Sequence, residues 1–520
     1  IEAQQTYLRL QPDGVSAIGV RAQLANSLAK TGNLDEAVKV RDELASIDPR
    51  SQFLMPTTKF LADTAFAHER YELSRMLYTK MVEAAQPKLA AEGLSGLAWT
   101  LAKLGESVES ATTFTRLVDR FPKSSLAAES AVMAARQLQK TGKGIAAAKM
   151  YERVASDYAD SDYLGEAALA VASFYTTEGA DKRKAVELLH RVCTANTQHS
   201  QIDAVLYRLA WVLVDLERLD EADKVFQRIN RDYRNSRFWA DATYRLAERA
   251  ANADNDDLAT KLAGDLIASN IQGDVRCHAL YLKGQLAAES ERWEDVEQTM
   301  QRIVEGFPES SLMLPSEYWL AEAKHRLGKI DEAAPLFKRL EKKTHNIREP
   351  WHAIICLRQA QILATKKQWL DAYEVANSIA ERFPGFRQQH EVDYVLGRCL
   401  SNRAEFQAAR QAYERVVRSP AGNRTETAAM AQWMIGESLL HQKKYDEAIR
   451  AYHRVETLYD FPRWQAAALL QAGKCHEAKG EVQNAIRLYA SLLKKYSDTS
   501  FVDEASQRLR AARKDTPADS

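Results

Sequence analysis

A small residue, Gly, Ala or Ser, recurs thirteen times along this chain at a spacing close to 37 residues. A second small residue follows twelve positions after almost every one of them, with Val296 as the exception. Helices approach closely only where their contacting side chains lack bulk, so this paired pattern predicts one helix–helix contact repeated along a stack. The first small positions are Ala25, Ala62, Ala98, Ala135, Ser173, Ala210, Ala247, Gly284, Ala321, Ala360, Gly397, Gly436 and Gly473.

A repeat array also explains how the chain reaches 520 residues. A single core usually serves roughly 100–200 residues, whereas each repeat of a solenoid packs only on its neighbours. Lys and Arg together number 71, as do Asp and Glu, so there is no basic excess of the kind that general nucleic-acid binders carry. The five cysteines are far apart and form no C-x-x-C, which favours buried free thiols over a disulfide framework.

Each repeat divides into two amphipathic halves. Apolar residues recur at i, i+3, i+4 and i+7 within each half, which is typical of a helix with one buried face. A polar turn joins the halves, and Gly32, Gly105 and Gly480 lie in it, where a helix end with positive φ is expected. Between repeats, Phe-Pro-x-Ser-Ser at 121–125 and 307–311 predicts a helix stop at Pro and a Ser cap on the next helix.

These signals give a domain organisation. We predict the second helix of an incomplete preceding repeat at 1–17, thirteen repeats over 18–500, a capping helix at 501–513 and a polar tail at 514–520. On this interpretation the first residues belong to the middle of a larger unit, and a targeting or anchoring segment is expected upstream of Ile1. The predicted repeat starts are 18, 55, 91, 128, 166, 203, 240, 277, 314, 353, 390, 429 and 466.

Asp-Glu-Ala occurs at 35–37, 220–222, 331–333 and 446–448, and an aromatic residue follows four positions later at Phe226, Phe337 and Tyr452. This pattern resembles the tetratricopeptide repeat. The resemblance implies an all-α, right-handed superhelical solenoid whose first helices line a concave face that binds other proteins. The Phe-Pro-x-Ser linkers are similar to those of the bacterial cell-envelope subgroup, the outer-membrane assembly lipoprotein and the Tol-Pal coordinator.

Aromatic residues recur along the first helices. Four tyrosines lie 37 residues apart at the fifth position of their repeats, and others continue the series or lie one turn later. Such a ladder predicts a surface for an extended or helical peptide, while the alternative is that the rings pack between adjacent first helices. The candidate partner-binding residues are Trp99, Phe174, Tyr207, Trp211, Tyr244, Tyr281, Tyr318, Tyr394 and Trp433.

Catalytic and metal-binding motifs are missing from the sequence. There is no G-x-S-x-G, no phosphate-binding loop and no H-E-x-x-H, and His352 and Cys356 are spaced for one helix face without a third ligand. No repeat combines Lys at its fifth position with Asn at its ninth, which disfavours the carboxylate clamp found in chaperone-binding relatives. We therefore expect no catalytic residue, cofactor or metal.

The sequence predicts a non-catalytic scaffold for protein partners. The linker resemblance favours a bacterial periplasmic or outer-membrane-associated assembly. A cytoplasmic assembly adaptor is one alternative. The other is the helical arm of a larger enzyme or membrane transport machine whose active or membrane domain lies upstream. No apolar stretch reaches the roughly 18 residues that a membrane span requires, and self-association through the same face stays open.

Overall fold

The computed structural model describes residues 1–177, 181–195, 199–269, 271–344, 346 and 349–514. These residues form 28 α-helices and no strand, which confirms the predicted all-α class. From residue 515 onward, the predicted polar tail lies outside the described residues. The chain divides into two compact units, residues 1–271 and 272–520.

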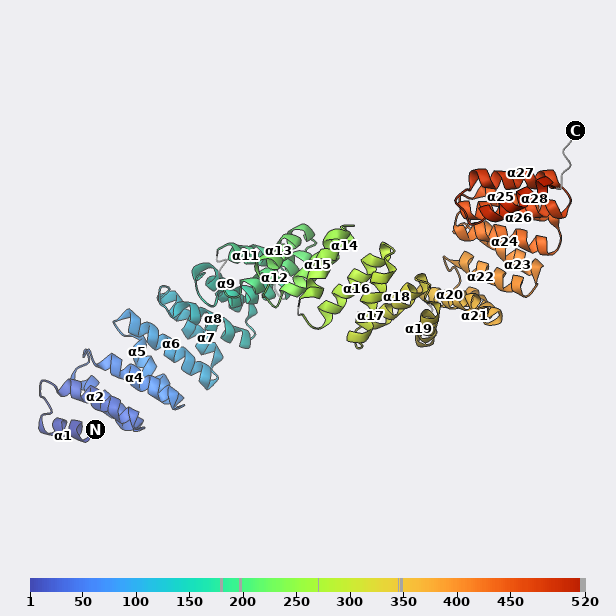
Figure 1. The fold of residues 1–520 in the computed structure, drawn as a ribbon. Coiled ribbons are helices and arrows are strands. Elements are labelled where there is room, and N and C mark those ends of the chain that lie inside the picture. The colour runs from blue at the N-terminus through green and yellow to red at the C-terminus, as the bar shows by residue number, and fades with distance from the viewer. Residues whose placement is uncertain (178–180, 196–198, 270, 345, 347–348, 515–520) are drawn as a thin grey trace. The chain divides into compact units, whose positions relative to one another are not determined.

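The first unit contains fifteen of the described helices (Figure 1). Their bounds are α1 (Glu2–Leu10), α2 (Ala17–Lys30), α3 (Leu34–Ile47), α4 (Leu54–Ala67), α5 (Tyr71–Val82), α6 (Pro87–Leu104), α7 (Ser107–Arg120), α8 (Ala127–Lys140), α9 (Gly144–Asp157), α10 (Leu164–Thr177), α11 (Lys182–Ala195), α12 (Ile202–Asp215), α13 (Leu219–Asp232), α14 (Trp239–Asn252) and α15 (Asp256–Ala268).

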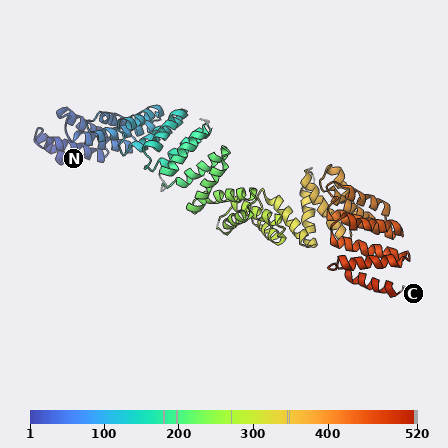
Figure 2. The ribbon, with the colours of Figure 1, turned by 90° about the horizontal axis from the view of Figure 1, so that it is seen from above.

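The second unit contains the remaining described helices, and those near its C-terminal end lie side by side in Figure 2. Their bounds are α16 (Asp274–Glu289), α17 (Trp293–Gly306), α18 (Met313–Arg326), α19 (Ile330–Thr344), α20 (Pro350–Thr365), α21 (Trp369–Arg382), α22 (Gln389–Asn402), α23 (Phe406–Arg418), α24 (Glu426–His441), α25 (Tyr445–Leu458), α26 (Pro462–Ala478), α27 (Val482–Lys495) and α28 (Val502–Lys514).

The helices from α2 to α27 form successive pairs, each with an even-numbered first helix and an odd-numbered second helix. Within each unit, every helix packs on the next one along the chain, and several first helices also contact the first helix of the following pair. This is the packing of a solenoid, in which each pair buries its apolar faces against its neighbours. At the C-terminal end, Ala505 and Leu509 of α28 pack against Leu470 of α26 and Tyr489 of α27.

The turn inside each pair has one backbone conformation. The residue two positions before the second helix has positive φ in every described turn, from Gly32 (φ 86°) to Gly480 (φ 77°). At the first turn, the Gly32 amide donates to the Ala29 carbonyl at 3.0 Å, and the Asn33 amide donates to the Leu28 carbonyl at 2.9 Å. This is the Schellman arrangement that closes a helix end.

Glycine was expected at this turn position, but the conformation is kept without it. Five described turns have glycine and seven have another residue with φ between 53° and 61°. The hydrogen bonds of the helix end therefore impose the left-handed conformation even where a Cβ opposes it. The seven residues are Glu69, Glu217, Asp254, Glu291, Lys367, Ala404 and Lys443.

The serines between pairs act differently from the prediction. Ser124 Oγ accepts a hydrogen bond from the Leu126 amide at 3.2 Å, and α8 begins after Leu126 with no side-chain cap. Ser310 makes the same bond to the Leu312 amide at 3.2 Å before α18. The expected helix caps are thus wrong at both linkers, because the serine stabilises the turn that precedes the helix.

The predicted contact between small residues is confirmed. Ser110 Oγ, at a second small position, donates to the carbonyl of Ala98, at the first small position of the same pair, at 2.8 Å. Ser74 Oγ makes the equivalent bond to the Ala62 carbonyl at 3.2 Å. The second helix thus lies within hydrogen-bonding distance of the first helix's backbone.

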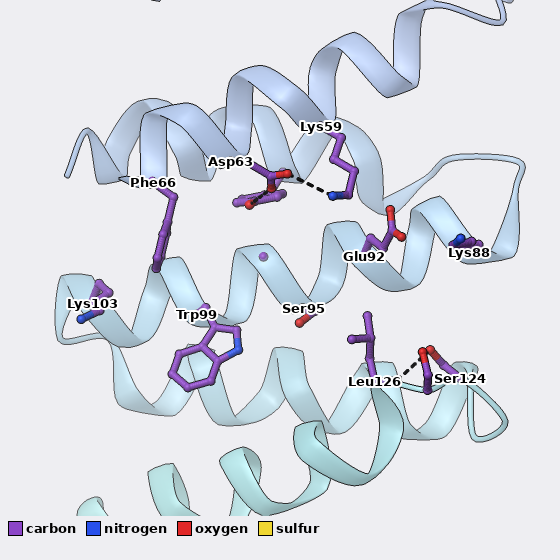
Figure 3. A pocket seen from close by; sticks show the side chains of 13 residues that line it. Lys59, Asp63, Phe66, Lys88, Glu92, Ser95, Trp99, Lys103, Ser124 and Leu126 are labelled. Atoms are coloured by element: carbon purple, nitrogen blue, oxygen red, sulfur yellow. Dashed lines mark hydrogen bonds and ion pairs between the residues drawn. The ribbon is translucent and has the colours of Figure 1, made fainter. Parts of the chain in front are cut away.

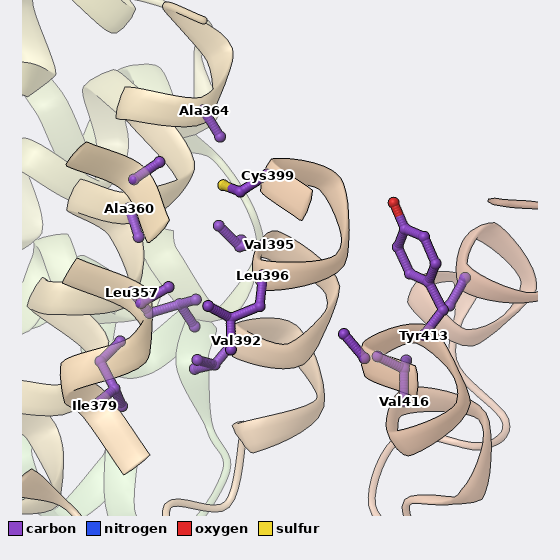
Figure 4. Packing of buried hydrophobic residues seen from close by; sticks show 14 of the residues in the cluster. Leu357, Ala360, Ala364, Ile379, Val392, Val395, Leu396, Cys399, Tyr413 and Val416 are labelled. Carbon is purple, nitrogen blue, oxygen red and sulfur yellow. The ribbon is translucent and has the colours of Figure 1, made fainter. Parts of the chain in front are cut away.

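The first small position also makes room for an aromatic ring, which the sequence analysis did not predict. A Cβ placed on Gly436 would lie 2.4 Å from the Tyr452 ring, and one on Gly397 would lie 2.5 Å from the Tyr413 ring. Figure 4 shows Tyr413 among the buried residues of α20 to α23. Glycine is therefore required on these first helices by the tyrosine of the paired second helix.

Candidate binding face on the first helices

The first helices, together with the turns that precede them, form what we call the first-helix face, and several hollows open on it. A hollow of about 600 Å³ is lined by residues of α4 and α6 and by the turn before α8 (Figure 3). Lys59 Nζ pairs with Asp63 Oδ2 at 3.0 Å, and Tyr78 Oη donates to Asp63 Oδ1 at 2.5 Å. Charged groups and Trp99 share this surface, which gives it both polar and aromatic contacts.

Trp99 and Phe174 each line a hollow of the first unit. Trp99 on α6 lies edge-on to the buried Phe114 of α7, with ring centroids 5.7 Å apart. Phe174 on α10 lies edge-on to Tyr175 at 5.3 Å and lines a second hollow of about 390 Å³ with Tyr151. Both side chains are partly buried, so each combines packing with an accessible surface.

Tyr207 and Trp211 of α12 contact residues at the start of and along the next first helix, α14, whereas the contact of Tyr244 lies within α14 itself. The Tyr207 ring of α12 stacks on Phe238, with centroids 4.5 Å apart, and Tyr207 Oη donates to Asp241 Oδ2 of α14 at 2.7 Å. The Arg245 guanidinium of α14 lies 4.9 Å from the Trp211 ring centroid and 5.9 Å from that of Tyr244. At Tyr207 and Trp211 the structure shows the predicted alternative of inter-helix packing, with a cation–π contact added at Trp211.

Tyr281 and Tyr318 are brought together in the second unit. They line one apolar hollow of about 280 Å³ between α16, α18 and α20, together with Trp319 and Trp351. Burial, more than nearby charge, raises the pKa of Tyr318 to about 12, so its hydroxyl stays protonated at neutral pH. This hollow offers aromatic surface with few polar groups.

Tyr394 and Trp433 lie further along the same unit. Tyr394 on α22 packs against Tyr413, with centroids 5.9 Å apart, and burial raises its pKa to about 12. It also lines a hollow of about 720 Å³ over α18, α20, α22 and α24. Trp433 on α24 packs against Trp464 of α26, with centroids 5.8 Å apart, so it bridges two neighbouring first helices.

The nine predicted residues therefore all lie on first helices and are all partly buried, but they do not share one site. Trp99, Phe174 and Tyr394 line three separate hollows, and Tyr281 and Tyr318 line a fourth together. Whether these rings contact a partner stays a prediction. The arginines around Tyr394 were missed, although their places on three consecutive first helices and the turn before the third were present in the sequence as a signal.

The described residues contain neither a metal-binding cluster nor a helix suited to crossing a membrane. No group of three or more His, Cys, Asp or Glu side chains lies close enough to hold a metal ion within the described ranges. Nor is any helix in that part of the chain both long and apolar enough to cross a bilayer. His352, which the sequence analysis considered as a metal ligand, lies edge-on to Phe383, with centroids 5.5 Å apart.

Family models of the tetratricopeptide repeat match residues 92–124, 204–236, 394–461 and 467–499. The matched segments are tetratricopeptide repeats. They lie in both units. Three of the matched segments each correspond to one helix pair of the fold, and 394–461 corresponds to two. Such repeats are protein-interaction scaffolds and are typically non-catalytic. No curated relative matches the chain.

Three solved structures illustrate the fold likeness. The APC/C hetero-tetramer Cut9–Hcn1 is 14% identical with a TM-score of 0.37, covering 98% of each chain. A tetratricopeptide repeat protein from Parabacteroides merdae is 15% identical with a TM-score of 0.32, covering 48% of this chain and 91% of that one. The P58(IPK) TPR domain is 14% identical with a TM-score of 0.31, and the match covers 82% of this chain and 97% of that one. With TM-scores below 0.5, these likenesses assign neither a partner nor a pathway.

Proposed function

We propose that this chain is a non-catalytic scaffold that binds protein partners through its first-helix face. The observation that carries the proposal is the set of hollows on that face, each lined by partly buried aromatic residues. A ring that is already held by its neighbours loses little freedom when a partner covers its accessible edge. The concave side of a repeat array is where such a face would enclose an extended or helical segment.

Site-specific photo-crosslinking tests this proposal. A photoreactive phenylalanine analogue replaces Tyr281 or Tyr318 in one pair of full-length variants, and Tyr445 or Tyr496 in a control pair. The control tyrosines lie at the start of α25 and just after α27, outside the first helices, and are also partly buried. We expect one specific protein adduct from the first pair and none from the second. Equal adducts from both pairs would contradict the proposal.

A combined variant measures the contribution of the aromatic residues. Tyr244→Ser, Tyr281→Ser and Tyr318→Ser together should weaken capture of the cross-linked partner while the helical circular dichroism is retained. The matched control changes Tyr71, Tyr445 and Tyr496 to Ser, none of which lies on a first helix. Unchanged capture by the folded first variant would show that these rings only pack.

The setting we propose for this scaffold is a bacterial cell-envelope assembly, in the periplasm or at the outer membrane. The support is the Phe-Pro-x-Ser linker style at 121–125 and 307–311. Fractionation of the source cells, with an antibody against this chain, tests the setting independently of the binding experiments. Recovery with cytoplasmic markers would reject the envelope setting and leave the scaffold function intact.

A further inference from the structure

The hollow over α18, α20, α22 and α24 has a charge character that differs from the other hollows. Four arginines and one glutamate line its 720 Å³. Three of the arginines lie on α18, α20 and α22, which are consecutive first helices of one unit, and the fourth lies in the turn before α22, so the arginines share one surface. The whole chain has no net charge, and a local excess of guanidinium groups therefore needs its own explanation.

Two of the four arginines are balanced by a carboxylate beneath the surface. Glu322 of α18 is only 3% exposed and accepts hydrogen bonds from Arg358 Nε at 2.7 Å and Arg358 Nη2 at 2.8 Å. Arg326 Nε also donates to Glu322 at 2.8 Å. One carboxylate thus holds two guanidinium groups, which fixes the wall of the hollow but leaves it with positive charge.

The other two arginines have no carboxylate partner within the described ranges. Arg387, in the turn before α22, is exposed, and Arg398 lies 5.7 Å from the Trp369 ring centroid. The glutamate in the lining is Glu391, whose Oε1 accepts from Thr427 Oγ1 at 2.6 Å. The mouth of the hollow therefore presents unpaired guanidinium groups, which bind carboxylates in a fixed, bidentate geometry.

A buried histidine in the same lining has one ring nitrogen without a hydrogen-bond partner, while its Nε2 lies 3.7 Å from Glu391 Oε1. His390 is 8% exposed, and its Nδ1 is buried with no partner in the structure. The Nδ1 atom of His325, at another side of the hollow, is also buried and unpartnered. Buried polar atoms normally have partners, so two unpartnered imidazole nitrogens in the lining of one hollow support a polar occupant there.

We propose that this hollow binds an acidic segment of a partner protein, with Arg387 and Arg398 as the charged contacts for its Asp or Glu side chains. The inference rests on the proposed scaffold function and specifies one partner chemistry for it. A carboxylate is the group that satisfies both the guanidinium forks and an imidazole N–H. A segment is favoured over a small anion because the lining extends over four first helices.

Fluorescence anisotropy with a defined probe tests this inference on the full chain. The probe is a labelled peptide of three Glu-Ser-Asp-Gly repeats, and the control peptide has Gln and Asn in place of Glu and Asp. We expect the acidic peptide to bind at about 50 mM salt, and its affinity to fall at higher salt because salt screens the charges. The neutral peptide should not bind. Failure of the acidic peptide to bind wild-type protein at low salt would overturn the inference.

Paired variants locate the contact. The double variant Arg387→Gln with Arg398→Gln should lower the affinity for the acidic peptide by roughly tenfold or more. Arg302→Gln with Arg450→Gln removes the same charge from exposed positions on the second helices α17 and α25, and should leave affinity within about twofold. Arg387→Glu alone alters only an exposed side chain and should weaken binding further than Arg387→Gln.

The remaining outcomes separate the inference from its alternatives and from the scaffold function. Equal weakening by both double variants would mean a diffuse charge effect and would overturn the inference. Displacement of the peptide by inorganic phosphate at equal carboxylate and phosphate concentrations would show a simple anion site and would also overturn it. If photo-crosslinking at Tyr281 succeeds while the acidic peptide fails, the scaffold function stands and this partner chemistry does not.

Discussion

At the scale of single residues, the contact between glycine and tyrosine decides what the first helix tolerates. Gly436 lies against the Tyr452 ring, where an added Cβ would be 2.4 Å away. We predict that Gly436→Ala lowers the local stability of α24 and α25 by about 1–2 kcal/mol, because overpacking outweighs the gain in helix propensity. Native-state hydrogen exchange of peptides from these helices measures the change.

Gly264 supplies the matched control. It lies inside α15, and no atom lies within 4 Å of an added Cβ. Gly264→Ala should therefore stabilise α15 by about 0.5–1 kcal/mol, the ordinary benefit of removing glycine from a helix. If both alanine substitutions stabilised their helices, the contact with the Tyr452 ring would not be what requires glycine at position 436.

The buried carboxylate of Glu322 is the second residue-scale determinant. Glu322→Gln leaves the Arg358 guanidinium, 12% exposed, without its charged partner. We predict a loss of about 3–5 kcal/mol in the local stability of α18 and α20, by the same exchange measurement. Glu447→Gln is the control, because Glu447 and Lys444 form an exposed pair at 3.9 Å, and removing it should change stability by less than about 1 kcal/mol.

The same carboxylate predicts a dependence on pH. Burial would raise the pKa of Glu322, but hydrogen bonds and charge from Arg358 and Arg326 outweigh burial and hold that pKa below its ordinary 4.5. A carboxyl with a lowered folded-state pKa stabilises the fold fully above the ordinary value, and the contribution is lost as pH falls through the lowered value. When wild type and Glu322→Gln are compared in an acid titration of stability, the variant should lose less stability as the pH falls.

At the scale of the helix pair, the turn conformation costs stability wherever glycine is missing. Ala404 has φ of 61°, a left-handed conformation that a Cβ opposes, and it precedes α23 by two residues. We predict that Ala404→Gly stabilises α22 and α23 by about 0.5–1 kcal/mol, since relief of strain exceeds the added flexibility of the unfolded chain. Gly480→Ala, at the equivalent turn, should destabilise α26 and α27, and hydrogen exchange across both turns checks the pair.

The helix pair is also the scale at which sequence reasoning was most reliable. Spacing of small residues is a local property of two neighbouring helices, so it predicted the all-α fold and the contact between Ala98 and Ser110. It could not predict the Gly436–Tyr452 contact, because spacing alone does not show where a side chain points. The arginine hollow was missed for a related reason: its lining comes from α18, α20, α22 and α24, and it exists only once these first helices are stacked.

At the scale of the whole molecule, strong contacts join only helices that are adjacent or next but one along the described chain. The stability of such an array is the sum of the stabilities of its helix pairs and of the interfaces between neighbouring pairs. The effect of one substitution on stability should therefore fade within a few helices. We predict that Gly436→Ala increases hydrogen exchange in α22 to α27 and leaves α2 to α7 unchanged. Increased exchange throughout both units would contradict local energetics and imply a single cooperative unfolding step for the 520-residue chain.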